Sequence, residues 1–502
     1  MRSAGKPHDG RNRCPMNTHT RFKRLSESDC QKLHWASVEI LERTGVRLHH
    51  QPAIDLLKKA GGSVSDGNRV RIPLALVEQA LTTAPHEITL YNRHGDPVVP
   101  LGKYRSFFGT GSDCLNILDH RTDERRQPVL QDVIDGMTLC DALPHIDFVM
   151  GMFLPGNVPH MVADRYVMEA MLNFTTKPIM FVTTDLAGCV DAVEMAEVVV
   201  GGQKGLQDRP LVACYVNVTN GLQHNAEALE KILYLSEKGL PSTYIPGALG
   251  GTTAPITLAG NMAIWNAGCL VGLVLSQLNR PGAPFITSGW GASALDMRTM
   301  VSPYVEPEKQ FIAQDLAHFY DLPMFAFGGC SDSKLVDQQA SLEAALTLLT
   351  NSLSGSHLVH DMGYLESGLT GSLAQLVICD EVISWIKAAL IPVEINDETL
   401  ALDVIDEIGP DGQFIDSDHT LTHFRDRWYP TLIDHHNYEG WRAKGGQDLG
   451  QRAAAKVDQL LTTHLPERLP TDIQMGLREI VQRAAVRERT VSFQGGKDVC
   501  EI

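Results

Sequence analysis

The first regular part of the chain, residues 25–100, alternates short helical and strand-like patterns. Apolar positions recur at helical spacing over residues 26–44, with Ser26 placed as an N-cap and Asp29 three residues later. Two more helices and two short strands are predicted, over residues 52–60, 74–83, 69–72 and 87–92. We therefore expect residues 25–100 to form an N-terminal α+β cap.

From residue 107 onward, short β-rich runs alternate with segments of helical period. Eight runs occur, beginning at residues 107, 148, 177, 209, 240, 283, 322 and 356. The helical segments between them include residues 190–200, 226–238, 258–278, 307–320, 336–353 and 372–390. Strand–helix–strand units at this repeat length predict a parallel sheet, and eight such units favour closure into a barrel. The fold class expected is α/β, with a (β/α)₈ TIM-type barrel over residues 101–392.

The competing interpretation is an open, doubly wound sheet. The first run is the least regular of the eight, because Gly109 and Gly111 interrupt it. Against the open sheet, no G-x-G-x-x-G motif follows an early strand, and the sequence contains no Walker A motif.

The barrel pattern stops beyond Pro392, and a C-terminal helical extension is expected over residues 393–490. Residues 491–502 are predicted to be a flexible tail, and residues 1–24 a disordered basic arm. The N-terminus lacks the apolar segment of a secretory signal. Either Met1 or Met16 could be the initiator.

Composition narrows the class of protein further. The formal net charge is -17, which argues against nucleic acid as a partner, because binding phosphates needs Lys and Arg. No apolar run reaches the ~20 residues of a membrane helix, so no membrane association is expected. The 10 cysteines show no C-x-x-C pair, which indicates reduced thiols and a cytoplasmic location.

In a barrel enzyme the reactive groups lie at the C-terminal ends of the strands. The segment GGCSDSK begins at Gly328, and its adjacent glycines would let a ligand approach the backbone closely. We predict that Gly328, Gly329 and Ser331 contact a cofactor and that Asp332 is catalytic. The alternative is a glycine-rich turn in which Asp332 only caps the next helix.

The segment HLVHDMGYLESG places His360, Asp361, Tyr364 and Glu366 at another strand end. If Leu358 and His360 face the same way, His360 points into the barrel, where a polar side chain needs a partner or a function. His360 and Glu366 are predicted to be catalytic. The alternatives are a histidine with a purely structural role and a glutamate paired with an arginine.

Two weaker clusters lie in the C-terminal extension. His419 and His423 stand four residues apart, a spacing at which two helical histidines can share a metal, but no H-E-x-x-H glutamate accompanies them. Asp434 and His436 match the start of a corrinoid-binding D-x-H-x-x-G motif, but the glycine comes one place late, at Gly440. We expect structural or subunit-contact roles here, with neither metal nor corrinoid bound.

Several long segments resemble the trimethylamine methyltransferase family, and in particular its branch that lacks pyrrolysine. They are LERTGVRLHHQPAIDLLKKAGG, APITLAGNMAIWNAGCLVGLVLSQLNRPGAP, GGCSDSKLVDQQASLE, HDMGYLESGLTGSLAQLVICDEVISW and HTLTHFRDRWYPTLIDHHNYEGW. The likeness covers nearly all of residues 25–490. It implies a (β/α)₈ barrel that transfers a methyl group from a methylamine to cob(I)alamin carried by a separate small corrinoid protein. No cofactor would then be bound in this chain itself.

The resemblance also indicates the substrate class. Founding members of the family use pyrrolysine to activate trimethylamine, whereas this sequence has only standard residues, and branch members act on quaternary amines such as glycine betaine. A quaternary ammonium loses a methyl group to give a neutral tertiary amine, which is a good leaving group. Aromatic faces and carboxylates hold such a cation. The predicted substrate contacts are Trp290, Tyr364, Phe108, Phe327 and Asn217, with Glu366 and Asp332 as counter-charges.

In this interpretation His360 holds a substrate carboxylate or a corrin side chain. A homo-oligomer is expected from the Trp-, His- and Arg-rich C-terminal region. Two alternatives stay open: a barrel enzyme with lyase or hydrolase chemistry, and a barrel protein that binds betaine-like ligands without methyl transfer.

Overall fold

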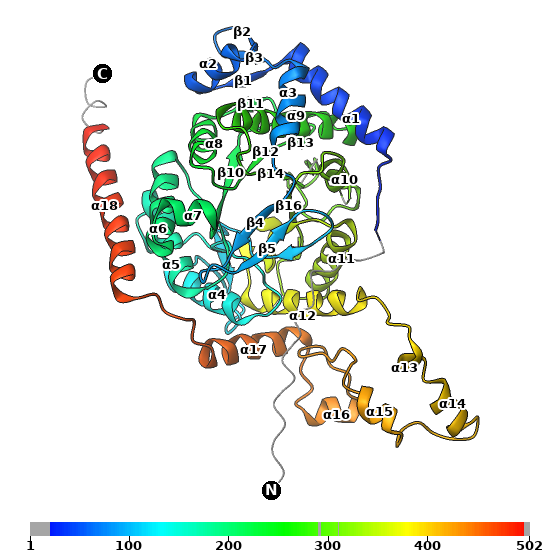
Figure 1. The fold of residues 1–502 in the computed structure, drawn as a ribbon. Helices are drawn as coiled ribbons and strands as arrows, with labels where there is room; N and C mark the ends of the chain where they lie inside the picture. The colour runs from blue at the N-terminus through cyan, green and yellow to red at the C-terminus, as the bar shows by residue number, and fades with distance from the viewer. Residues whose placement is uncertain (1–20, 290–292, 310, 496–502) are drawn as a thin grey trace.

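The computed structural model describes residues 21–289, 293–309 and 311–495. Its largest sheet has seven parallel strands in the order β6–β17–β16–β14–β12–β10–β9 (Figure 1). In that order the strands are Phe107–Phe108, Leu358–His360, Met324–Phe327, Phe285–Ser288, Ser242–Pro246, Val212–Val218 and Ile179–Val182. All seven lie within the runs that the sequence predicts as strands.

The segment at Phe148 and Val149 completes the ring. Phe148 forms a parallel bridge with Gly109, directly after β6, and Val149 forms one with Ile179 of β9. Because β6 and β9 are the two edges of the seven-stranded sheet, this segment closes the barrel. A Cβ on Gly109 would lie 2.6 Å from the carbonyl oxygen of Phe148, so the glycine permits the closure. The predicted (β/α)₈ barrel is confirmed, and the open sheet is excluded.

Helices cover the outside of the barrel. They are α4 (Leu130–Ala142), α5 (Ala163–Phe174), α6 (Leu186–Val200), α7 (Gln203–Asp208), α8 (Ala226–Lys238), α9 (Leu258–Asn279), α10 (Ile312–Phe319), α11 (Gln338–Ser354) and α12 (Leu373–Ala389). Among the described residues, α9 is the one helix long and apolar enough to cross a membrane, which corrects the expectation that no such run exists. Most of it is buried inside the protein, as in a core helix.

The N-terminal cap packs on α9 and closes one end of the barrel. Its elements are α1 (Glu27–Glu39), which continues as a π-helical turn (Ile40–Thr44), α2 (Gln51–Lys59), α3 (Leu74–Thr83), β1 (Val46–Leu48), β2 (Ser63–Ser65), β3 (Arg69–Arg71), β4 (Ile88–Tyr91) and β5 (Pro97–Leu101). The predicted capping box of Ser26 and Asp29 is present at the start of α1.

The β4–β5 hairpin fills the end of the barrel at which the strands begin. Its apolar side chains, among them Leu90 and Leu101, share one buried cluster with interior barrel residues such as Ile245 and Phe325. The backbone N–H of Tyr91 also donates to the Pro210 carbonyl, just before β10. The opposite end, where the strands terminate, is therefore the one that can receive a ligand.

Short elements surround that opposite end and link the barrel to the cap. They are β7 (Asn116–Leu118), β8 (Arg125–Arg126), β11 (Gln223–His224), β13 (Leu249–Gly250), β15 (Ser293–Ala294), β18 (Tyr364–Leu365) and β19 (Thr370–Gly371), with short 3₁₀ helices at His160–Val162, Pro307–Lys309 and Glu366–Gly368. Four of the strands, β18, β19, β7 and β8, form a small sheet at the mouth.

The C-terminal region consists of α13 (Asp397–Leu400), α14 (Leu402–Ile408), α15 (Asp418–His423), α16 (Tyr438–Ala443), α17 (Leu449–Thr463) and α18 (Thr471–Gly495). Helix α17 packs on α12, and α18 packs along α5 and α6 (Figure 1). Between α12 and α17, residues 393–446, here called the arm, carry α13 to α15 away from the barrel. Helix α18 continues to Gly495, beyond Val491, where the sequence predicts a flexible tail.

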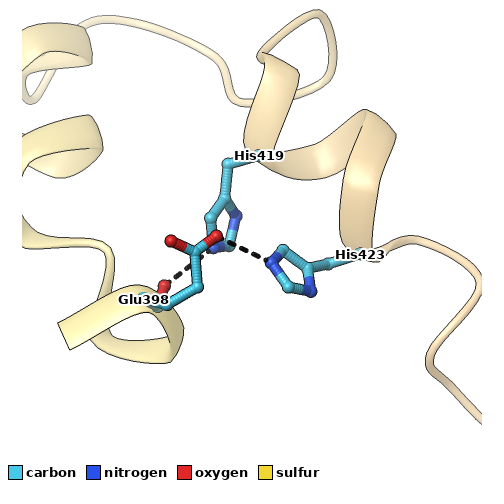
Figure 2. Close-up of side chains that lie close together, drawn as sticks. All are labelled: Glu398, His419 and His423. Atoms are coloured by element: carbon cyan, nitrogen blue, oxygen red, sulfur yellow. Dashed lines mark hydrogen bonds and ion pairs between the residues drawn. The ribbon is translucent and has the colours of Figure 1, made fainter. Parts of the chain in front are cut away.

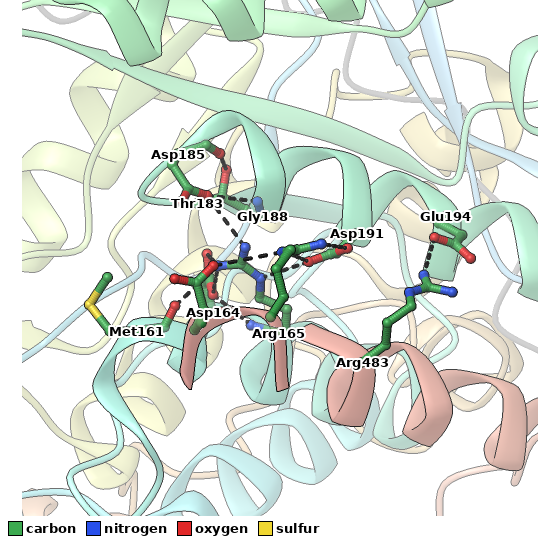
Figure 3. Close-up of polar contacts among 11 residues, drawn as sticks. Met161, Asp164, Arg165, Thr183, Asp185, Gly188, Asp191, Glu194 and Arg483 are labelled. Carbon is green, nitrogen blue, oxygen red and sulfur yellow. Dashed lines mark hydrogen bonds and ion pairs between the residues drawn. The ribbon is translucent and has the colours of Figure 1, made fainter. Parts of the chain in front are cut away.

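A buried arginine joins α18 to the barrel helices (Figure 3). The Arg165 side chain is 1% exposed and forms ion pairs with Asp164 at 2.9 Å and Asp191 at 3.1 Å. Arg487 of α18 binds the same Asp191 carboxylate at 2.6 Å. Because each buried charge has partners of opposite sign, the network holds α5, α6 and α18 in one arrangement.

Candidate active site at the mouth of the barrel

His360 lies at the end of β17 and points into the barrel, as its spacing from Leu358 predicts. Leu358 belongs to the interior cluster, and the His360 ring stacks on Phe325 with centroids 4.1 Å apart. Its Nδ1 lies 2.5 Å from Oδ1 of Asp361. Its Nε2 is buried and has no hydrogen-bond partner in the described part of the chain. A buried nitrogen left in this state marks a position where a ligand can bind.

Asp361 is the centre of the polar contacts at the mouth. Its second oxygen, Oδ2, accepts a hydrogen bond of 2.5 Å from the Tyr304 hydroxyl. Tyr304 comes from the loop between β14 and α10, and its ring meets Phe327 edge to face at 5.3 Å. The Tyr304 loop and the β17 end are thereby joined through one carboxylate.

Gly111 lets two side chains enter the mouth together. A Cβ at this position would lie 2.1 Å from Oδ1 of Asp361 and 2.4 Å from the ring of Tyr364. The Tyr364 hydroxyl donates to the Ser112 carbonyl next to it. The glycine that interrupts the first β-rich run is therefore the residue against which Asp361 and Tyr364 pack.

Aromatic side chains gather around this carboxylate. They are Tyr215, which meets the His360 ring at 6.3 Å, together with Tyr304, Tyr364 and Phe327. Burial, and with it the negative charge of Asp361, raises the pKa of each of the three tyrosine hydroxyls. The hydroxyls therefore stay neutral. Neutral aromatic faces beside a carboxylate form a favourable site for an organic cation.

Left-handed backbone conformations occur at several non-glycine residues near the same end of the barrel. Asp113 has φ 66°, Met152 φ 57°, Asp361 φ 81° and Glu366 φ 52°. Residues other than glycine adopt such angles at a cost of the order of 1–3 kcal/mol each, and they do so mainly at functional sites.

One side of the mouth is open to solvent. Asp113, Thr184, Asn217 and Gly247 follow or end four different barrel strands, and all four are exposed. Asp113 is surrounded by protein despite its exposure, and this desolvation raises the pKa of its carboxyl group. The aromatic cluster can therefore be approached from outside between these strand ends.

Asp332 lies beside the cluster and supports it. Its carboxylate accepts the backbone N–H groups of Tyr304 at 2.8 Å and Val305 at 3.0 Å, and also the Ser367 hydroxyl at 2.6 Å. All of these donors are neutral. The geometry thus makes Asp332 a residue that positions Tyr304, a role the sequence did not predict.

Glu366 is placed in an ion pair with Arg125, the alternative that its sequence context left open. Arg125 Nε donates to the Glu366 carboxylate at 2.8 Å and Nη2 does so at 3.2 Å, while Thr370 also donates to it. These contacts lower the pKa of the Glu366 carboxyl despite partial burial. Its charge is therefore paired with that of Arg125 at the rim of the mouth.

The remaining predicted side chains fall into four groups. Tyr364, Phe327 and Asn217 line the mouth. Phe108 faces the outer helices instead, where Lys387 lies 5.6 Å above its ring. Ser331 is buried and donates to Glu343 at 2.6 Å. Trp290 lies outside the described residues.

The two glycines at the end of β16 serve the packing of the turn. Gly329 has φ +74°, and a Cβ there would lie 3.0 Å from Met362. A Cβ on Gly328 would lie 3.0 Å from Val359. Both glycines let the turn after β16 pack closely against the end of β17. In the structure, their role is therefore to allow this close packing of the turn.

The sequence placed Asp361 at the same strand end as His360 without giving it a role, and it did not single out Tyr304 or Asp113 as site residues. Asp361 stands next to the predicted His360, and its position beside a strand-end histidine was the available signal. Tyr304 is far from any predicted strand end in the sequence, so no signal in the sequence pointed to it.

The cysteines nearest the mouth, Cys114 and Cys330, are buried, which raises the pKa of both thiols well above the ordinary value. They are therefore protonated and unsuited to nucleophilic catalysis.

Comparison with known proteins gives a consistent assignment. The chain matches the family model described as trimethylamine methyltransferase (MTTB) over residues 2–488. It is 34% identical over 462 residues to a trimethylamine methyltransferase MttB of Desulfitobacterium hafniense (strain DSM 10664 / DCB-2), covering 91% of this chain and 93% of the relative. It is 29% identical to a glycine betaine methyltransferase of Desulfitobacterium hafniense (strain Y51), covering 92% and 97%.

A further relative is trimethylamine methyltransferase MttB1 of Methanosarcina mazei, at 29% identity over 92% of this chain and 94% of the relative. The solved structure of monomethylamine methyltransferase MtmB from Methanosarcina barkeri shares 13% identity, covers 90% of both chains and has a TM-score of 0.46.

Proposed function

Because the chain belongs to the trimethylamine methyltransferase family, we propose that it transfers a methyl group from a small quaternary ammonium compound, such as a betaine, to cob(I)alamin on a separate corrinoid protein. The observation that carries this proposal is the cluster of Tyr215, Tyr304, Tyr364 and Phe327 around Asp361, at the open end of the barrel.

The cluster suits a permanent cation better than a neutral amine. A quaternary nitrogen has no N–H to donate, so it is bound through aromatic faces and through the field of a carboxylate. Asp361 supplies that charge, with both of its oxygens already hydrogen-bonded to His360 and Tyr304. The carboxylate therefore stays fixed in place when the substrate binds.

His360 is suited to a second group on the substrate. Its Nδ1 is engaged by Asp361, and its Nε2 remains buried without a partner among the described residues. When the ring is protonated, Nε2–H can donate to a carboxylate such as that of a betaine. Two contacts, one to the ammonium group and one to the carboxylate, would fix which methyl group faces the opening.

The bond that breaks joins the methyl carbon to nitrogen, and its electron pair remains on nitrogen. The product is a neutral tertiary amine, which needs no proton in order to leave. The corrinoid of the partner protein supplies the nucleophile, so this chain needs no nucleophile of its own. The exposed strand ends at Asp113, Thr184, Asn217 and Gly247 provide the side from which that partner can approach.

The test is a substrate panel assayed with cob(I)alamin under reducing conditions. We expect methylcobalamin to form with at least one quaternary amine among glycine betaine, proline betaine and carnitine, and not with trimethylamine. The matched control ligand is 3,3-dimethylbutanoate, which replaces the nitrogen of glycine betaine with carbon and removes the positive charge. If this analogue, which lacks the positive charge, binds as well as glycine betaine does, the cation site is refuted.

The same assay separates the alternatives. Saturable betaine binding without methyl transfer to any corrinoid would identify a binding protein. Turnover of a substrate without cob(I)alamin would identify lyase or hydrolase chemistry.

We also propose a cytoplasmic homo-oligomer. The support for self-association is the arm, which exposes large apolar side chains, including Ile395 at 74%, Ile415 at 81% and Leu421 at 71%. Contiguous exposed apolar surface is typical of subunit interfaces.

A further inference from the structure

The arm contains a cluster of potential metal ligands (Figure 2). Glu398 of α13 lies against His419 and His423 of α15, and one ligand atom from each residue lies within 4.8 Å of the others. The sequence shows two histidines at a spacing that can share a metal but no glutamate within the same helix. Folding of the arm brings that carboxylate from 21 residues upstream.

We propose that Glu398, His419 and His423 bind a zinc ion that holds α13 against α15. Two imidazole nitrogens and one carboxylate oxygen are ligands that Zn²⁺ takes in tetrahedral sites, leaving the fourth position for water. His423 Nε2 lies 3.2 Å from Oε1 of Glu398. Tetrahedral ligands with bonds of ~2.0–2.1 Å stand ~3.3 Å apart, so these two atoms already have the spacing of a zinc site.

The surroundings of His423 support a ligand role. Its Nδ1 lies 2.8 Å from Oδ2 of Asp426, which leaves Nε2 directed at Glu398. A carboxylate that accepts the second ring N–H of a histidine fixes the ring and the tautomer, as is usual for zinc-bound histidines. The His419 ring lies beside it with centroids 4.5 Å apart, and its Nε2 is 3.2 Å from the Glu398 carbonyl oxygen.

The helices of the arm have no buried core of their own. None of the residues in α13, α14, α15 or α16 is buried, and α13 and α15 have only four and six residues. Segments too small to bury a core commonly depend on a metal or another cross-link. A zinc ion between α13 and α15 would join two segments that share little apolar contact.

The direct test measures zinc bound to the full-length protein. We expect one equivalent of Zn²⁺ to remain after dialysis of the wild type, and Co²⁺ to give the intense visible absorption of a tetrahedral complex. His419→Gln and His423→Gln should each abolish both signals. His435→Gln and His436→Gln, which change histidines of the same region outside the cluster, serve as matched controls and should retain them.

A second variant separates metal binding from a purely structural effect. Asp426→Asn leaves all three ligands in place and alters only the group behind His423, so zinc affinity should fall about 10- to 100-fold. Hydrogen exchange of residues 397–423 should be slowed by zinc in the wild type and unchanged by zinc in His423→Gln. Wild-type protein that binds no zinc, or control variants that lose it equally, would overturn the proposal. Because the site lies outside the barrel, methyl transfer is measured separately and does not decide it.

Discussion

The Tyr304 hydroxyl donates to the Asp361 carboxylate at 2.5 Å, and this contact joins a loop after β14 to the end of β17. The two residues lie 57 positions apart in the sequence. The hydrogen bond places an aromatic face and a negative charge side by side, which are the two features that a cation site requires.

Removing the charge of Asp361 should impair the enzyme most. For Asp361→Asn we expect kcat/KM for methyl transfer from the active quaternary amine to fall about 10- to 100-fold, since charge-assisted contacts are worth about 1.5–3 kcal/mol. Tyr304→Phe keeps the ring and loses the hydroxyl, so its loss should be smaller. Steady-state assays over a range of substrate concentrations measure both.

Glu366→Gln is the matched comparison, because it removes another carboxylate from the same rim. Its charge is paired with Arg125, and partly exposed ion pairs contribute at most about 1 kcal/mol. We expect kcat/KM within about fivefold of the wild type. A loss as large as that of Asp361→Asn would show that Glu366 faces the substrate after all.

Asp332 should act through the loop that it holds. Asp332→Ala removes the acceptor for two backbone N–H groups and for Ser367, so Tyr304 should lose its fixed position. We expect KM to rise about tenfold or more, with a smaller change in kcat. The reason is that one or two hydrogen bonds to a charged group are lost. Hydrogen exchange of residues 302–309 should become faster. A variant that loses kcat with an unchanged KM and unchanged exchange would instead indicate direct participation in the reaction.

Gly111→Ala tests the packing of the mouth. The added Cβ would meet the Asp361 carboxylate at 2.1 Å and the Tyr364 ring at 2.4 Å, so both side chains must move. We expect a loss of activity comparable to that of Asp361→Asn, because shifts of about 1 Å in an active site can cost ~10²-fold. Gly476→Ala in α18 is the control, since the nearest atom to its Cβ would be at 3.4 Å. Full activity in Gly111→Ala would contradict the geometry.

Acid stability should depend on His357, which lies buried at the start of β17. Its Nδ1 accepts the Met324 N–H at 3.0 Å, and its Nε2–H donates to the Lys103 carbonyl at 2.8 Å. Burial lowers the pKa of this histidine from 6.5 to about 4. The folded protein therefore requires the neutral form of His357. The contribution of this residue to the free energy of unfolding is fully present above pH 6.5 and is lost as the pH falls toward 4.

The loss amounts to about 3 kcal/mol over that range, since each pKa unit corresponds to ~1.4 kcal/mol. Urea unfolding of the wild type and of His357→Gln, measured from pH 7.5 to pH 4, isolates this contribution from that of other histidines. The free-energy difference between the two proteins should shrink on acidification. Two parallel curves would rule out the role of His357.

Much of the fold could be predicted from local patterns. The alternation of β-rich and helical segments is fixed by which side chains face the core, so eight strand positions and the barrel class could be inferred from periodicity alone. The direction of His360 followed from Leu358 two residues earlier, because successive side chains in a strand alternate between faces. The same reasoning located the glycine-rich turn at the end of β16, although not its role.

What the sequence determined by itself, therefore, is the set of strands and helices and the end of the barrel at which the candidate site lies, because these depend on short-range periodicity. The tertiary structure alone decided that Gly109 closes the ring against Phe148, that Asp361 binds Tyr304, that Asp332 supports that tyrosine, and that Glu398 reaches two histidines of the arm. Each of these contacts joins residues remote in the chain. Side-chain spacing within one segment carries no information about such distances, which are set only when the elements pack together.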